Sequence, residues 1–120
     1  MDQQEIGALK AELRQFTGSE KFYRHPLFPP YIYTEGVQFL AEKAGAYWLL
    51  DHIFAHQPEL KGQRFQVWKI TVSADASARI SVEDGNDAEL AAYPLGYTDF
   101  PLEAFSLWLV DGILMLPSEY

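Results

Sequence analysis

The sequence predicts an α+β fold in which N-terminal helices pack on one face of a C-terminal four- to five-stranded antiparallel meander sheet. Apolar residues recur at helical spacing in the first half of the chain, and β-branched and aromatic residues dominate the second half. Turn-forming pairs such as Asp111-Gly112 separate the later apolar runs. At 120 residues and 48% hydrophobic content the chain can bury one ordinary core, so we expect a single domain over residues 1–120.

The first helix is expected over about residues 2–16. Ile6, Leu9, Leu13 and Phe16 recur at spacings of three and four, which places them on one stripe of an amphipathic helix. Gly18 supplies a stop signal just beyond this stripe.

An irregular, proline-rich and aromatic connector is expected over residues 17–34. Pro26, Pro29 and Pro30 remove backbone donors and push the residues before them toward extended conformations, so no helix can continue through it. Thr34 is suited to cap a following helix, because its hydroxyl can accept from an unpaired amide of the first turn.

A helix or a broken pair of helices is expected over about residues 35–57, before Pro58. The polar face of its first half is replaced by Leu49 and Ile53 in the second half. The pattern changes near Gly45, which predicts either a break at that point or a helix covered on nearly every side.

Antiparallel strands are expected over about residues 64–118. The runs 64–72 and 78–83 are rich in strand formers and form a predicted pair around the turn "SADAS", and "EDGND" predicts a second turn before a weaker strand at Glu89–Tyr93. Asp111-Gly112 is the pair typical of a type I′ hairpin. If the last apolar run, "ILML", forms an exposed edge, it could pair with a second copy, so a homodimer stays open.

The net charge of −8 lies in the C-terminal third. Residues 75–120 contain nine acidic residues and Arg79 as their one basic residue. We expect no direct nucleic-acid binding there, because repulsion from a polyanion would oppose it, and a basic protein partner is permitted. The candidate acidic surface consists of Glu83, Asp84, Asp87, Glu89, Asp99 and Glu103.

Composition excludes several kinds of site. With no cysteine there is no disulfide, zinc thiolate or iron–sulfur cluster. The first residues are polar and acidic, unlike a signal peptide, and no stretch approaches the roughly 20 apolar residues of a membrane span. We therefore expect a cytoplasmic protein that does not enter a membrane.

No cofactor or metal is predicted. His52 and His56 have the spacing that brings two imidazoles to one metal, but Ile53 stands where a zinc protease has its glutamate. A polar strip near a helix end is the favoured interpretation. The isolated glycines form no phosphate-binding loop.

Asp51 is the most informative residue of the second predicted helix. On the helical wheel it projects into an apolar quarter beside Leu40, where an unpaired carboxylate would be costly. A donor from the connector, Arg24, His25 or a tyrosine, would relieve this cost. A structural tether is the favoured interpretation and a general base the alternative. The candidate binding residues are Tyr23, Arg24, His25, Tyr31, Tyr33 and Asp51.

Several runs together resemble a known family. They are "FTGSEKFYRH", "YTEGVQFLAEKAGAYWLLDHI", "FQVWKI", "EDGN", "TDFPL" and "LPSEY". The chain resembles, from about Leu13 to Tyr120, a domain-of-unknown-function family of short, uncharacterised bacterial proteins associated with plasmids, phages and other mobile elements. The resemblance implies a complete single-domain protein in a bacterial or phage setting, and it carries no activity or catalytic residue.

Three functions remain after these exclusions. The favoured one is a non-enzymatic protein-binding or regulatory module, because every catalytic constellation is incomplete. The second is an antagonist of a host defence or regulatory system whose acidic face imitates nucleic acid. The third is a small enzyme that uses Asp51, Arg24 and His25.

Overall fold

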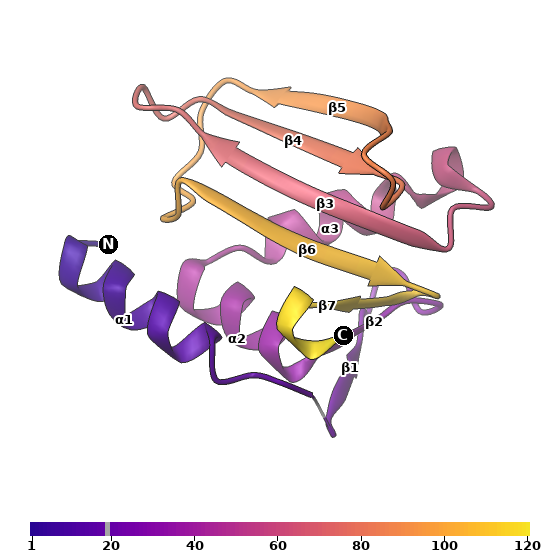
Figure 1. Ribbon diagram of the computed structural model, residues 1–120, viewed down its shortest axis with the longest axis horizontal. Coiled ribbons are helices and arrows are strands. Elements are labelled where there is room, and N and C mark those ends of the chain that lie inside the picture. The colour runs from indigo at the N-terminus through magenta and orange to yellow at the C-terminus, as the bar shows by residue number, and fades with distance from the viewer. Residues whose placement is uncertain (19) are drawn as a thin grey trace.

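The computed structural model describes residues 1–18 and 20–120. Within them it has three α-helices and a seven-stranded sheet in the strand order β1-β2-β7-β6-β3-β4-β5 (Figure 1). The elements in chain order are α1 (Gln3–Leu13), β1 (Phe22–Arg24), β2 (Ile32–Thr34), α2 (Glu35–Ala44), α3 (Tyr47–Ala55), the 3₁₀ helix η1 (Gln57–Leu60), β3 (Phe65–Val72), β4 (Ala78–Glu83), β5 (Glu89–Leu95), β6 (Ala104–Val110), β7 (Ile113–Met115) and the 3₁₀ helix η2 (Pro117–Glu119).

The α+β class is confirmed, whereas the prediction of four to five antiparallel strands is wrong. β3, β4 and β5 form the predicted antiparallel meander, with the expected turns between them. The chain then crosses back, and β6 pairs with the other side of β3. Two further strands come from the connector, and β2 pairs with β7 in parallel, so the sheet is mixed.

Helix α1 forms as predicted but ends earlier. Asp2 caps it by accepting from the Glu5 N–H, and the Glu5 side chain accepts from the Asp2 N–H in return. Leu9 and Leu13 are its buried residues. Phe16 lies beyond the helix, and its ring packs against Phe39. The last residue of the predicted apolar stripe therefore belongs to the connector and not to the helix.

Residues 22–34 of the connector form a β-hairpin, so the expected irregular connector is wrong for this part, while Ser19 lies outside the described residues. Tyr23 pairs with Tyr33 across β1 and β2, and Ile32 pairs with Ile113 of β7. Strands of three residues are too short to show an alternating pattern, and their pairing depends on the far end of the chain. The predicted Thr34 cap is present, because its Oγ1 accepts from the Val37 N–H at 3.2 Å.

The predicted helix break is at Gly45. Gly45 adopts a left-handed conformation, with φ of 62°, and closes α2 before α3 begins at Tyr47. The two helices pack on different parts of the sheet. α3 faces β3, β4 and β6 through Leu49 and Ile53, while α2 contacts β1, β2 and β7.

β7 is an interior strand. The β6–β7 hairpin turns at Asp111 and Gly112, whose φ values of 50° and 84° are those of the predicted type I′ turn. β7 then lies between β6 and β2, and Leu114 is fully buried. The last apolar run is therefore not an exposed edge of the sheet, and the two outer strands of the sheet are β1 and β5.

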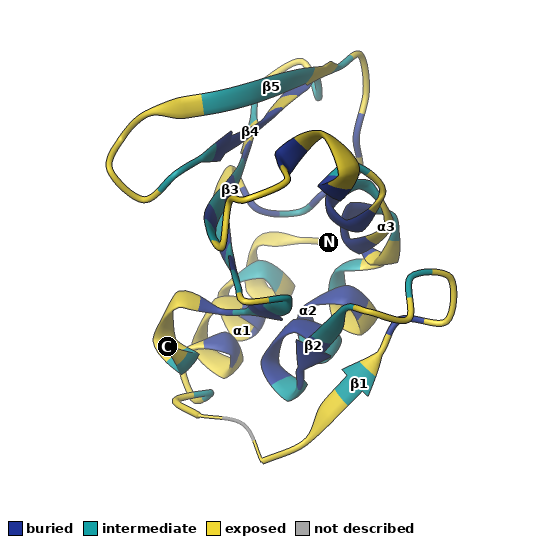
Figure 2. Cartoon of the chain, turned by 90° about the vertical axis from the view of Figure 1, so that its right-hand side faces the viewer, coloured by how far each residue is buried: buried dark blue, intermediate teal, exposed yellow. Residues whose placement is uncertain are grey.

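The core lies between the sheet and the helices. Its large buried side chains include Trp68, Phe54, Ile80 and Leu107, and Figure 2 shows α2 and α3 buried over much of their surface while β1 is mostly half-buried or exposed. α1 lies outside this layer, against α2, so the expectation that every N-terminal helix packs on the sheet face holds for α2 and α3 and not for α1. None of the described helices has the length and apolar character needed to cross a bilayer.

Candidate functional site

Half of β6 has a strand neighbour on one side only. β7 pairs with Trp108, Leu109 and Val110 and ends at Met115. It cannot continue, because the Leu116 N–H donates to the Glu119 side chain at 3.0 Å and Pro117 has no N–H to give. In the described part of the chain, residues 104–107 of β6 therefore pair with β3 alone.

The unpaired edge of β6 presents the backbone groups of Ala104 and Ser106. The Glu103 C=O accepts from the Val72 N–H at 2.8 Å, so it points toward β3. Along an antiparallel strand successive residues point their backbone groups to opposite sides. Phe105 and Leu107 therefore bond to β3, and the N–H and C=O of Ala104 and Ser106 face away from it.

A groove of about 610 Å³ runs along this edge. α1 forms one wall and η2 the other, and Figure 1 shows both elements beside β6. Its buried floor is formed by Leu13, Leu102 and Leu116, and the volume lies within the range of pockets that bind ligands. The remaining lining residues are Lys10, Arg14, Ala104, Phe105, Ser106, Pro117 and Ser118.

The C-terminal wall of the groove is anchored to α2. Thr34 Oγ1 donates to Glu119 Oε1 at 2.6 Å, and the Gly36 N–H donates to Glu119 Oε2 at 3.4 Å. A carboxylate at a helix N-terminus is stabilised by the unpaired amides and the positive end of the helix dipole. The Tyr120 ring then packs against Trp108 on the outer face of the sheet. The wall is thus held by contacts of its last two residues, Glu119 with the start of α2 and Tyr120 with Trp108.

The structure pairs Asp51 with His25. His25 Nε2 lies 2.5 Å from Asp51 Oδ1, and the Leu27 N–H donates to His25 Nδ1 at 3.1 Å. Because Nδ1 accepts, the ring proton is on Nε2 and both ring nitrogens are occupied. His25 is buried, but the Asp51 side chain is 51% exposed. The expectation that the Asp51 carboxylate is buried is therefore wrong. The break at Gly45 gives α3 a new axis, which a wheel drawn from residue 35 cannot represent.

The other connector residues make internal contacts. Arg24 Nη1 donates to the Pro29 C=O at 2.5 Å and does not reach Asp51. The Tyr23 and Tyr33 rings stack at 5.7 Å, and burial raises the pKa of Tyr33. Tyr31 stacks on the buried ring of Phe54, with the ring centroids 5.3 Å apart. Of the candidate trio for catalysis, only His25 and Asp51 meet.

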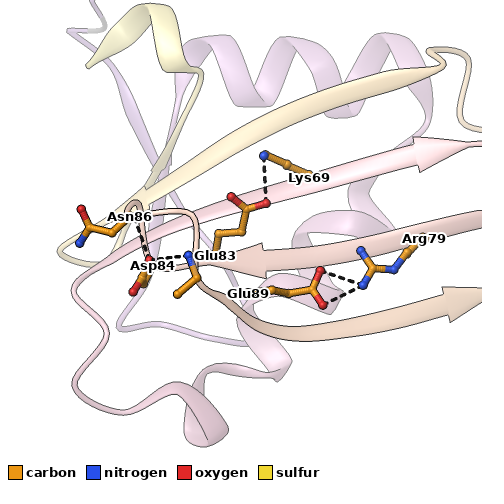
Figure 3. Close-up of polar contacts among 7 residues, drawn as sticks. Lys69, Arg79, Glu83, Asp84, Asn86 and Glu89 are labelled. Carbon is orange, nitrogen blue, oxygen red and sulfur yellow. Dashed lines mark hydrogen bonds and ion pairs between the residues drawn. The ribbon is translucent and has the colours of Figure 1, made fainter.

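The candidate acidic residues do not share one surface. Glu83, Asp84, Asp87 and Glu89 flank or form the turn between β4 and β5, whereas Asp99 and Glu103 lie in the connection that follows the far end of β5. Figure 3 shows Glu83, Asp84 and Glu89 of the first group; Glu83 pairs with Lys69 at 2.9 Å, and Glu89 pairs with Arg79. Asp84 accepts from the backbone of its own turn. Two of the six candidate carboxylates, those of Glu83 and Glu89, are therefore paired with a cation.

His52 and His56 contact each other and an aromatic cluster. His56 Nδ1 donates to the His52 C=O at 2.7 Å, and both rings pack on Tyr93. Burial, with a smaller contribution from His56, lowers the pKa of His52 to about 4, so His52 is neutral at pH 7. Its Nε2 is buried with no hydrogen-bond partner among the described residues. Across those residues no three His, Asp or Glu side chains gather as a metal would require.

The comparison with protein families gives one match. A family model described as a family of unknown function (DUF6876) matches residues 7–120. The chain belongs to this family. The comparison with curated proteins gave no significant match, and the comparison with solved structures gave none either.

In this DUF6876 chain, sequence reasoning missed the groove. Its residues come from α1 and its C-cap Arg14, from the 96–103 connection, from β6 and from residues 116–118, and no motif joins them. One local signal was available. Pro117 directly follows the last apolar run, and a proline there ends the strand. The run before it is shorter than the apolar run that forms β6, so the last strand cannot pair with the whole of β6.

Proposed function

We propose that the protein is a non-enzymatic binding module that accepts an extended segment of a partner protein in the groove beside β6. The segment adds a strand to residues 104–107, where β7 has ended. The observation that carries the proposal is the half-edge of β6: the Ala104 and Ser106 backbone groups face a groove with an apolar floor. Strand addition to a free sheet edge is a common mode of peptide recognition.

The arrangement of the groove supports an extended ligand over a compact one. Four strand residues span about 13 Å, which suits a short segment lying along the edge. Main-chain hydrogen bonds would supply affinity, and the leucines of the floor would accept side chains from one side of the segment. The anchored η2 wall keeps the site open without a large rearrangement.

We place this module in the bacterial cytoplasm, in keeping with the resemblance to short proteins of plasmids, phages and other mobile elements. The partner is then a protein of the element or of its host. The His25 and Asp51 pair stays a structural tether in this proposal, since both ring nitrogens of His25 are occupied.

Replacement of Ser106 by Pro tests the proposal. Peptides of twelve random residues displayed on phage are selected on the immobilised protein, and the affinities of the selected peptides are measured for both proteins by fluorescence anisotropy. Pro removes the N–H that faces the groove and leaves the pairing with β3 intact, so affinity should fall by roughly tenfold or more. Ala104→Trp, which fills the groove from an exposed position, should also weaken binding.

Ala92→Pro on β5 is the matched control. Ala92 pairs with β4 two residues before Pro94, which has no N–H, so the Ala92 N–H also faces a free edge of the sheet. This variant should bind the selected peptides like the wild type. If the Ser106→Pro and Ala104→Trp proteins remain folded and bind as tightly as the wild type, the proposal is wrong.

A further inference from the structure

We infer that the partner segment is acidic and carries two carboxylates at alternate positions, which meet Lys10 and Arg14. This inference rests on the proposed function of the groove and names the chemistry of its ligand. It comes from the charges on the α1 wall, which are independent of the β6 backbone edge.

Lys10 and Arg14 are two cations on one wall of an otherwise largely apolar groove. They are four residues apart and therefore neighbours on one side of the helix end, where like charges repel each other. Neither has an acidic partner within 4 Å in the described part of the chain. An anionic ligand would remove this repulsion.

Three of the seven other cations have a carboxylate partner. Lys69, Arg79 and Arg64 pair with Glu83, Glu89 and Asp111 respectively. The remaining four, Lys21, Arg24, Lys43 and Lys61, have none within 4 Å in the described part of the chain, but they do not line the groove. In a chain of net charge −8, two unpaired cations lining one groove give that groove a charge opposite to that of the molecule. A basic residue at a helix C-terminus also suits the helix dipole, but the dipole does not explain why both charges line the groove.

The spacing of the two cations fits an extended ligand. Four residues of α-helix rise about 6 Å, and alternate residues of a strand, which lie on the same side, are about 7 Å apart. Two carboxylates at positions i and i+2 of an added strand can therefore face Lys10 and Arg14 together. Consecutive carboxylates cannot, because they point to opposite sides of the strand.

Two matched synthetic peptides test this inference. One has the sequence Ser-Val-Glu-Val-Glu-Val-Ser, with blocked ends, and the other has lysine in place of both glutamates. We expect the glutamate peptide to bind the wild-type protein about tenfold more tightly than the lysine peptide, with the difference shrinking as salt is added. The double variant Lys10→Glu, Arg14→Glu should reverse the preference.

The double variant Lys21→Glu, Lys61→Glu is the control. It changes the net charge by the same amount at exposed positions outside the groove, and it should keep the preference for the glutamate peptide. Equal affinity of both peptides for the wild type, together with loss of both in the Ser106→Pro protein, overturns the acidic ligand and leaves the proposed function standing. Reversal of the preference in the control variant also overturns it. Failure of both synthetic peptides to bind the wild type, when the peptides selected from phage do bind it, overturns the acidic ligand and leaves the proposed function standing.

Discussion

Replacing Gln66 by Leu will lower the free energy of unfolding by about 3 kcal/mol, although leucine is apolar and similar in size. Gln66 is 1% exposed. Its Oε1 accepts from Gln57 Nε2 and from Trp68 Nε1, both at 2.9 Å, and its Nε2 donates to Gln57 Oε1 at 2.8 Å. Leucine leaves Gln57 Oε1 and Trp68 Nε1 buried without these partners, whereas Gln57 Nε2 keeps its bond to the Ile53 C=O. Each buried group without a partner costs roughly 1–3 kcal/mol.

Urea unfolding followed by circular dichroism measures this loss. Gln63→Leu is the control, because Gln63 is exposed and contributes its backbone C=O to the network, so its side chain can be replaced at little cost. The double variant Gln57→Leu, Gln66→Leu should lose less than the sum of the single variants, since each partner removes the group that the other leaves unpaired. Additive losses would mean that the two amides do not interact.

Replacing Gly36 by Ala will destabilise the protein by about 2 kcal/mol, against the helix propensity of alanine. A Cβ at position 36 would lie 2.7 Å from both Glu119 Oε1 and Leu116 Cδ1. Leu116 is buried and Glu119 is hydrogen-bonded, so neither can move without loss. The substitution should displace η2, the C-terminal wall of the groove, and weaken peptide binding together with stability.

Gly7→Ala is a control of opposite sign. Gly7 lies in α1 with no atom within 4 Å of its Cβ position, so alanine there should stabilise by up to about 1 kcal/mol. Thermal unfolding of the two single variants gives the comparison. An increase in melting temperature for both would show that the contact between η2 and α2 is looser than described.

Local signals predicted much of the fold. Thr34, Gly45 and Asp111-Gly112 act through backbone conformations that depend on their nearest neighbours, and each holds the predicted cap, break or turn. β1 and β2 were missed, because three-residue strands carry no period and β2 depends on β7 at the other end of the chain. Strand pairs of this kind are set by tertiary contacts.

The candidate site could be predicted only in part. His25 was among the donors expected for Asp51, and the structure pairs the two residues. The expected burial of Asp51 is wrong, because a single helical wheel cannot represent α2 and α3, which have different axes. The groove is lined by residues from distant parts of the chain, such as Lys10, Ser106 and Leu116. Only the three-dimensional packing shows that β7 pairs with one half of β6 and leaves the other half without a strand on that side.

Amide hydrogen exchange at Ala104 and Ser106, measured by NMR with and without a selected peptide, tests the strand addition most directly. In the free protein we expect these two amides to exchange quickly, while Phe105 and Leu107, bonded to β3, are protected. Saturating peptide should slow exchange at Ala104 and Ser106 by about tenfold or more. Unchanged exchange at both amides under saturating peptide would contradict the account.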